Sequence, residues 1–457
     1  MNQIAAMEEM KMRETKALLD INRMVYLMPS MAGLMDQRTD IYYFFNNQTC
    51  TPGDTILANG NSSSYFLWGP ACFLKLQWTV TNTAAAAVNS ISFGYGSIMN
   101  MIKEIRITHS SGEVMEYIQN VNVLAAAKTR WGTCYDDQIK LNALLGGVDT
   151  TAAGSSYGGG IAFGFGPNQN PPLPAGQVSQ VFVAAASSVQ FTSLIPMSYI
   201  AGIFDRTDQY IPPSLLAGST IQIVMTTSSD AYTSSAAGAG TATITEIRPS
   251  FIYDCARAFD SATRVILNEQ SSEDGLQYVY STYFNTYINS NTSSVNFDVQ
   301  QAASVTENVF AVFRPAAAIT GASLATFVPA PNQYQWRIGA DFKPQAILNI
   351  PNIGGVPQSA EPLMQSLKTW ESGLHQYSTE VGYGASVSLL EFNTFAALYG
   401  TSLERTACGL SLTGVPTNNA CLLNFAAQKD AVAHRIDIFL RYLRCANLRG
   451  AGVVIDR

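Results

Sequence analysis

The segment IPMSYIAGIFDRTDQYIPPSLLAGSTIQI, residues 195–223, has the clearest architectural pattern in the chain. Its apolar first part ends at Gly202 and Phe204, and a polar turn follows. The proline pair 212–213 is expected to exclude both a helix and a central strand, and a new strand is predicted from Ile221 onward. No residue in the segment is arranged for chemistry. We interpret it as a structural clamp.

Most of the chain on either side of this segment has the composition of β-strands. From residue 40 onward, runs rich in Val, Ile, Phe, Tyr and Thr are broken by Gly, Pro, Asn and Ser. Apolar and polar residues alternate over 295–299 and 435–441, which predicts strands with one buried face. Short helices are expected only in connections, near 118–127 and 360–370.

Two stretches of low complexity are expected to be long surface loops. Residues 149–180 are rich in Gly and Pro, and residues 226–243 consist almost entirely of Ser, Thr, Ala and Gly. Neither stretch has enough apolar residues to build a core by itself. Both are expected to lie between strands of one domain, as outer loops.

The length of 457 residues suits two β domains, because β-sandwiches commonly use about 200 to 250 residues each. A change from strand-like to polar composition between Ala256 and Gly275 marks the expected boundary. We therefore predict an N-terminal helical arm over 1–38, a first domain over 39–258 and a second domain with a C-terminal tail over 259–457.

The N-terminal arm is predicted from helical spacing over residues 2–28. Its apolar face consists of Ile4, Met7, Met10, Ala17, Leu18, Ile21, Met24, Val25 and Met28. Charged residues occupy the other faces, and a Met-rich face adapts to irregular partners. Packing on its own domain and docking on a neighbouring subunit are about equally supported. Binding to a membrane surface is less favoured, because Lys and Arg do not dominate the polar face.

Charged residues make up only 13% of the chain, against about 25% in typical soluble proteins. A neutral polar surface suits a protein that packs against copies of itself, although a secreted β protein would also fit. The net charge of −7 argues against sequence-specific nucleic-acid binding. Near the C-terminus, an ordinary solvated strand is favoured over a basic inner face for a group of arginines, namely Arg435, Arg441, Arg444, Arg449 and Arg457.

Residue patterns for catalysis, metal binding or cofactor binding are missing from the sequence. The three histidines, at 109, 375 and 434, are isolated, and the seven cysteines are scattered without metal-site spacing. The cysteines are predicted to be buried reduced thiols, which suits synthesis in the cytosol. No secretory leader and no membrane-spanning run is recognised. We predict a protein that is not an enzyme and has no cofactor.

Several segments, taken in order, resemble the double jelly-roll major capsid proteins of icosahedral double-stranded DNA viruses. Residues 195–225 and 334–347 are the two main matching segments, with supporting matches at 251–254, 309–314 and 360–367. The stretch YQWRIGADFKPQAI, residues 334–347, is the more specific of the two main matching segments. The residues taken as landmarks of the fold are Gly202, Phe204, Pro212, Gly218, Trp336, Arg337, Gly339 and Pro344.

This resemblance implies an all-β fold of two tandem eight-stranded jelly rolls, in a homotrimer that forms a pseudo-hexameric capsomer. It further implies a virion protein, made in the host cytoplasm, that contacts neighbouring capsomers and minor capsid and penton proteins. An inner membrane or the genome is a further candidate contact on the inner face. A carbohydrate-binding or carbohydrate-cleaving β-sandwich is the alternative function. A spike or penton protein is disfavoured, because residues 275–445 supply a second jelly roll.

Overall fold

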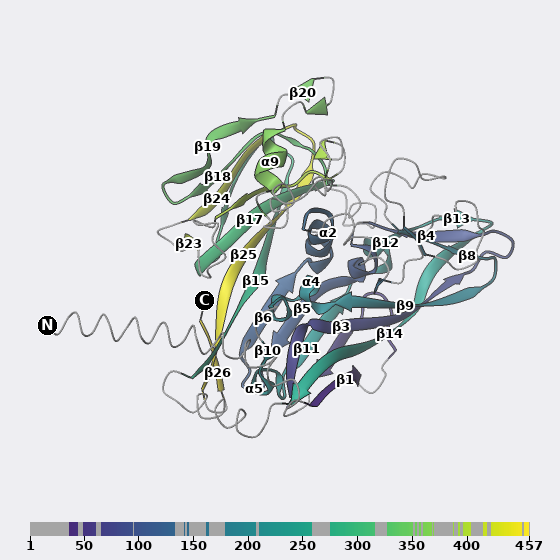
Figure 1. The fold of residues 1–457 in the computed structure, drawn as a ribbon. Helices are drawn as coiled ribbons and strands as arrows, with labels where there is room; N and C mark the ends of the chain where they lie inside the picture. Colours follow the sequence, from purple (N-terminus) through teal and green to yellow (C-terminus); the bar gives the residue numbers. More distant parts are fainter. Residues whose placement is uncertain are drawn as a thin grey trace, which may run out of the picture.

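The computed structural model describes most of the chain beyond residue 35 and resolves it into two halves, residues 36–257 and 275–456 (Figure 1). The described residues are 36–43, 49–60, 65–94, 96–132, 141, 144–145, 161–163, 179–206, 210–257, 275–315, 327–350, 352–353, 356–357, 360–367, 369, 387, 392–393, 396–403, 415–417, 422–449 and 452–456. The predicted N-terminal helix and the predicted boundary at 258/259 both lie outside these residues.

The first half contains two antiparallel sheets and a smaller insertion sheet. Sheet 1A has the order β1-β14-β3-β10, and it consists of β1 (Asp36–Tyr43), β3 (Tyr65–Asn82), β9 (Ser188–Pro196), β10 (Tyr210–Ile211), β13 (Ala236–Ala237) and β14 (Gly240–Arg257). Sheet 1B has the order β2-β11-β5-β6, made of β2 (Thr55–Asn59), β5 (Ile102–Thr108), β6 (Val114–Gln119) and β11 (Thr220–Met225). The insertion sheet contains β4 (Asn89–Phe93), β7 (Ile161–Phe163), β8 (Ser179–Val183) and β12 (Tyr232–Ser234).

The second half repeats the two main sheets. Sheet 2A has the order β15-β25-β17-β22, and it consists of β15 (Leu276–Ser290), β17 (Ala303–Pro315), β22 (Tyr399–Ser402), β23 (Val415–Thr417), β25 (His434–Arg449) and β26 (Gly452–Asp456). Sheet 2B has the order β16-β24-β18-β19, made of β16 (Ser294–Val299), β18 (Pro331–Ile338), β19 (Asp341–Asn349) and β24 (Leu423–Lys429). A short pair, β20 (Asn352–Ile353) and β21 (Val356–Pro357), follows β19.

The two halves have the same strand order, element by element. Along the chain, β1, β2, β3, β5, β6, β11 and β14 correspond to β15, β16, β17, β18, β19, β24 and β25, and β9 with β10 corresponds to β22. A helix follows the fifth strand of this series in both halves, α2 (Val121–Trp131) after β6 and, beyond the short β20–β21 pair, α9 (Glu361–Leu367) after β19. Two four-stranded antiparallel layers in this order form a jelly roll. The predicted all-β fold of two tandem jelly rolls is confirmed, and so are the short helices in connections.

Aromatic side chains fill the space between the sheets of the second half. Phe425 lies 4.5 Å from Trp336, which belongs to sheet 2B as Phe425 does, measured between ring centroids. Across the core, Phe425 lies 6.1 Å from Phe313 of sheet 2A. Tyr399 of sheet 2A packs edge-on against Tyr334 of sheet 2B at 5.1 Å. Large buried rings of this kind contribute both apolar area and geometric specificity. They join the two layers into one core.

Strand β25 departs from the sequence-based prediction of one buried face. Both of its faces are buried, and Asp437 is fully buried together with Arg314 of β17. The guanidinium of Arg314 donates to the Asp437 carboxylate from Nε at 2.8 Å and from Nη2 at 2.5 Å. Alternating charges predicted solvent on one side because a buried charge is rare unless it is paired. Here the pairing partner is on the neighbouring strand.

The prediction that the two prolines at 212–213 exclude a helix is wrong. A short helix, α5 (Pro213–Leu216), begins at the second proline. Proline is tolerated in the first helical turn, because its missing N–H has no partner there and its φ is already suitable. The strand predicted from Ile221 is confirmed as β11, and Gly218 before it has a φ of 65°, a conformation that favours glycine.

The low-complexity stretch 226–243 is more ordered than the predicted surface loop. It forms α6 (Ser228–Ala231), β12, β13 and the beginning of β14, and Tyr232 is buried with its hydroxyl accepting from the Ile244 N–H. Strand β12 pairs with β4, so backbone pairing supplies the order that apolar content does not. Of the second predicted loop, 149–180, only residues 161–163 and 179–180 are described, and they belong to β7 and β8.

Candidate functional site

The most elaborate polar site of the described residues lies where the two halves meet. Strand β6, helix α2 and the turn η3 (Gly202–Phe204) of the first half pack against β15 and β25 of the second (Figure 1). The turn η3 is part of the segment 195–223, so the predicted clamp holds more than its own jelly roll. Its position follows from α4 (Met197–Ile200), which turns the chain away from β9.

Glu116 of β6 is the centre of this contact and is fully buried. Its carboxylate accepts the N–H of Gly202 at 2.8 Å, the N–H of Ile203 at 3.2 Å and the hydroxyl of Thr282 on β15 at 2.5 Å. Burial raises the pKa of Glu116, while the hydrogen bonds and the charge of Arg444 oppose that rise. One side chain therefore joins the clamp segment to both jelly rolls.

The backbone next to Glu116 receives donors from the second half. The carbonyl of Met115 accepts the Tyr280 hydroxyl at 2.5 Å and the guanidinium of Arg444 at 2.6 Å. The Tyr278 hydroxyl donates to the carbonyl of Ile203 at 2.9 Å. Burial raises the pKa of Tyr280, so its hydroxyl stays a donor at physiological pH. These bonds satisfy backbone groups that the contact removes from water.

A second polar cluster lies at the start of α2. Asn120 precedes the helix with a φ of 49°, in the left-handed region that Asn tolerates better than most residues. The side-chain amide nitrogen of Asn120 donates to the side-chain oxygen of Asn285 at 2.6 Å, and Arg435 donates to the side-chain oxygen of Asn120 at 3.5 Å. The same Arg435 lies over the ring of Tyr287 at 3.9 Å. The unusual backbone at Asn120 thus turns β6 into α2 while binding the second half.

Near its C-terminal end, α2 contacts both its own half and the second half. Lys128 donates to the carbonyl of Ser198 at 3.0 Å and lies 4.7 Å from the centre of the Tyr283 ring on β15. The indole N–H of Trp131 donates to the carbonyl of Ala396 at 3.1 Å. Burial lowers the pKa of Lys128, partly offset by the nearby carboxylates of Asp205 and Glu116.

The backbones of the two halves approach each other closely at Gly202. A Cβ at this position would lie 1.7 Å from the carbonyl oxygen of Ser281, which is far inside van der Waals contact. Glycine is required here because only a residue without a side chain allows the two backbones to approach so closely. Its N–H is the one that binds Glu116.

The eight predicted landmarks fall into two separate groups. Gly202 and Phe204 lie in η3, Pro212 precedes α5, and Gly218 precedes β11. The others lie in or next to the hairpin of β18 and β19, namely Trp336, Arg337, Gly339 and Pro344. Trp336 is buried in the core, whereas Arg337 is exposed and donates to the carbonyl of Gly339 at 2.9 Å. Of the eight, Gly202 lies directly against the second half.

Sequence reasoning missed the polar residues of this contact. Glu116, Asn120 and Thr282 were not predicted, although an acid inside the apolar strand VMEYIQ is a signal that could have been followed. Arg444 was assigned to a solvated strand and not to this contact.

The solvated strand favoured for the C-terminal arginines is also wrong for Arg441 and Arg444, whereas Arg449 is exposed and Arg457 lies outside the described residues. Arg444 is buried, and Arg441 pairs with Glu307 at 2.8 Å. These cations are engaged within the chain, so they do not present the basic inner face that was the other interpretation.

The arrangement of the contact is structural. Its buried ionisable groups, Glu116, Lys128 and Arg444, bind backbone N–H groups, backbone carbonyls and a side-chain hydroxyl. Among the residues that the structure describes, no group of three or more His, Cys, Asp or Glu could hold a metal ion. No helix in that part of the chain is long and apolar enough to cross a bilayer.

Two of the buried cysteines are placed as predicted. Cys50 and Cys72 are buried, and their thiols donate to the carbonyls of Ile247 and Trp68. Burial raises the pKa of the Cys50 thiol to about 12, so this thiol is protonated and unreactive at neutral pH. The histidines that are described serve structure. His109 bonds to Ser111 at 2.9 Å, and His434 lies 3.0 Å from Asp430.

Comparison with solved structures finds the same fold in viral capsids. The structure is similar to the PBCV-1 virus capsid, with a TM-score of 0.55, 9% identity and coverage of 93% of this chain and 97% of that chain. It is similar to the Faustovirus major capsid protein, with a TM-score of 0.55, 8% identity and coverage of 90% of both chains. The Sputnik virophage structure gives a TM-score of 0.54 at 10% identity, covering 92% of this chain and 88% of that chain.

By contrast, the sequence matches no family model and no curated protein. At identities near 9%, the similarity shows the fold alone, and it extends over 93% of the chain in the comparison with the PBCV-1 capsid. The repeated strand order, the helix after the fifth strand of each series and the nearly full-length similarity agree with one another. The chain has the double jelly-roll fold of the major capsid proteins of icosahedral viruses.

Proposed function

We propose that the chain is a major capsid protein that assembles as homotrimers, each forming a pseudo-hexameric capsomer of an icosahedral shell. The observation that carries the proposal is the pair of equivalent jelly rolls joined by a fully buried contact centred on Glu116. Two equivalent domains fixed side by side let three copies present six similar lobes. A shell tile needs such rigidity, because domains that move independently would not keep a constant outline.

The composition supports a structural role for the surface. Charged residues are 13% of the chain, and many of those described are used internally, as in the pairs Arg314–Asp437 and Arg441–Glu307. A neutral polar exterior allows close association with other copies, since a large excess of like charge opposes it. Neighbouring capsomers, minor capsid proteins and penton proteins are the proposed partners in the virion.

The oligomeric state tests the proposal. The purified full-length chain is expected to have three times the monomer mass of 49.3 kDa in sedimentation or native mass spectrometry. Electron images of its assemblies are expected to show lobed tiles, each with three or six lobes. A chain that stays monomeric across salt and pH would contradict the proposal, and specific glycan binding by that monomer would favour the carbohydrate-binding alternative.

The predicted N-terminal arm adds a second, separable part to the proposal. We propose that residues 1–28 tie capsomers to each other or to minor capsid proteins on the inner side of the shell. Deleting these residues is expected to leave the trimer intact and to block its further assembly into shells, as measured by sedimentation and electron microscopy. Normal shells from the truncated chain would refute the role of the arm while leaving the capsomer proposal in place.

A further inference from the structure

The outer face of sheet 2A, the face turned away from sheet 2B, is covered. Phe310 and Val312 of β17 and Phe439 of β25 lie on this face and are fully buried, and the two phenylalanine rings stack at 5.1 Å. Asn285 stands opposite Phe439 in the strand register and bonds to Asn120 of the first half. The first half therefore covers this face through β6 and α2.

The equivalent outer face of sheet 1A lacks such a cover within the described residues. Phe73 of β3 stands directly opposite Ile252 of β14, and Lys75 stands opposite Leu194 of β9, so the four side chains share one face. All four are half-buried, whereas the inward residues that alternate with them, such as Leu74, are fully buried. We call this set, Phe73, Lys75, Leu194 and Ile252, the 1A patch. Its apolar side chains have the character of the sheet 2A face without its cover.

The two helices α2 and α9 also differ in burial: α2 is covered, and α9 is partly exposed. Every residue of α2 is buried, because the helix lies between sheet 1B and the second half. Helix α9 has the equivalent place in the chain order of the second half, after β19, yet Met364 is 44% exposed and Glu361 is exposed. Phe342 and Ile347 of the adjacent strand β19 are 44% and 54% exposed. We call these four residues the α9 ridge.

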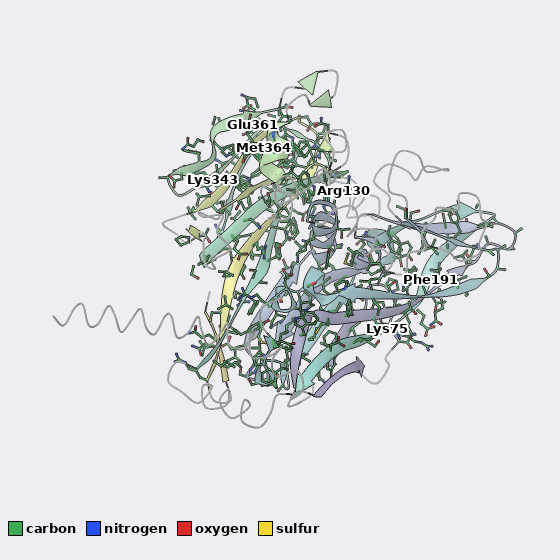
Figure 2. All side chains as sticks on the ribbon, in the orientation of Figure 1. Lys75, Arg130, Phe191, Lys343, Glu361 and Met364 are labelled. Carbon is green, nitrogen blue, oxygen red and sulfur yellow. The ribbon has the colours of Figure 1, made fainter. Side chains whose placement is uncertain are left out.

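We propose that the α9 ridge of one copy covers the 1A patch of the next copy, as α2 and β6 cover sheet 2A within each chain. The inference rests on the proposed trimer and names the surfaces that make it. Opposite charges support the match, since Glu361 belongs to the ridge and Lys75 to the patch. In Figure 2, Glu361 and Met364 lie on the second half, and Lys75 lies on a distant part of the first half.

Because the ridge and the patch are far apart on one chain, the contact must join two copies. A contact between two different surfaces is heterologous, and it closes into a ring when the rotation between copies allows. Each copy then gives one ridge and receives one ridge. The continuity with the contact around Glu116 predicts that the intermolecular interface repeats the intramolecular one.

Two single substitutions and a matched control test the pairing. Phe73→Asp in the patch and Met364→Asp in the ridge are each expected to convert the full-length trimer to folded monomers. Val88→Asp, at a residue that is 61% exposed and outside both surfaces, is expected to leave the trimer unchanged. Circular dichroism and thermal unfolding show that each variant is folded, and Lys75→Glu replaces Phe73→Asp if that variant does not fold.

Mixing the two variants gives a sharper result. The Phe73→Asp copy keeps a working ridge and the Met364→Asp copy keeps a working patch, so their mixture is expected to form a 1:1 dimer that cannot grow. Native mass spectrometry distinguishes this dimer by the mass difference between the variants. Trimers from either single variant, or a mixture that stays monomeric, would overturn the pairing. A wild-type chain that never trimerises would instead overturn the proposed function on which the pairing rests.

Discussion

Replacing Gly202 by alanine is expected to cause a larger loss of stability than the same replacement at the other described glycines. The new Cβ would meet the carbonyl oxygen of Ser281 at 1.7 Å, and neither backbone can move without disturbing the bonds to Glu116. Overpacking at such a site costs about 3 kcal/mol of unfolding free energy. Denaturant unfolding followed by circular dichroism measures the difference.

Gly112 offers the matched control for this substitution. It has a φ of 91°, and a Cβ there would meet nothing within 4 Å. Gly112→Ala therefore tests backbone strain without a steric clash, and it is expected to cost only about 1 kcal/mol. Equal losses in the two variants would show that the close approach at Gly202 is not what makes glycine necessary there.

Removing the Glu116 carboxylate is expected to loosen the two jelly rolls from each other. Glu116→Ala leaves the buried N–H groups of Gly202 and Ile203 and the hydroxyl of Thr282 without their acceptor. Buried donors without partners cost about 1 to 3 kcal/mol each, so the total loss is expected to reach about 3 kcal/mol or more. Proteolysis between the halves is expected to become faster in parallel.

Glu116→Gln separates the charge of this residue from its hydrogen bonding. Burial raises the pKa of Glu116 in the folded chain, so the folded state binds its proton more tightly than the unfolded state. The contribution of this group to stability is therefore largest below the usual glutamate pKa of about 4.3 and declines as the pH rises through the folded-state pKa.

Unfolding free energies of the wild type and of Glu116→Gln, measured from acidic to neutral pH, provide the test. The stability of the wild type relative to the variant is expected to fall as the pH rises. A relative stability that instead increases with pH would mean that the hydrogen bonds and Arg444 outweigh burial at this site.

Local pattern was sufficient for much of the fold. Alternation over 295–299 predicted β16 correctly, because Val295 and Val299 face the core while the polar residues between them face outward. The strand predicted after the proline pair 212–213 and Gly218 is β11, and that prediction is correct. The same alternation predicts a solvated Asp437 in β25, and there the prediction is wrong because Asp437 is buried. Whether a charged side chain is buried depends on which element packs over its sheet, and the periodicity of residues along one strand does not indicate that element.

The contact between the halves was out of reach for a related reason. Glu116 finds its partners 86 residues away at Gly202 and 166 residues away at Thr282. Arg444 reaches the carbonyl of Met115 across 329 residues. Thr282 and Arg444 have an ordinary local context, and the acid in the apolar strand of Glu116 does not indicate which groups it binds; only the juxtaposition of two complete jelly rolls gives these residues a role. The landmarks drew attention to Gly202, but not to the acid that binds its N–H.

The position of β25 in sheet 2A has a consequence for synthesis of the chain. This strand lies between β15 and β17 and pairs with both, although it comes some 120 residues later in the sequence. A nascent chain can complete the first jelly roll early, whereas β15 lacks its partner strand, and β17 lacks one of its neighbours, until residues 434–449 leave the ribosome. Chains truncated before that point would carry an open sheet, so we expect cellular quality control to remove them before they can enter a particle.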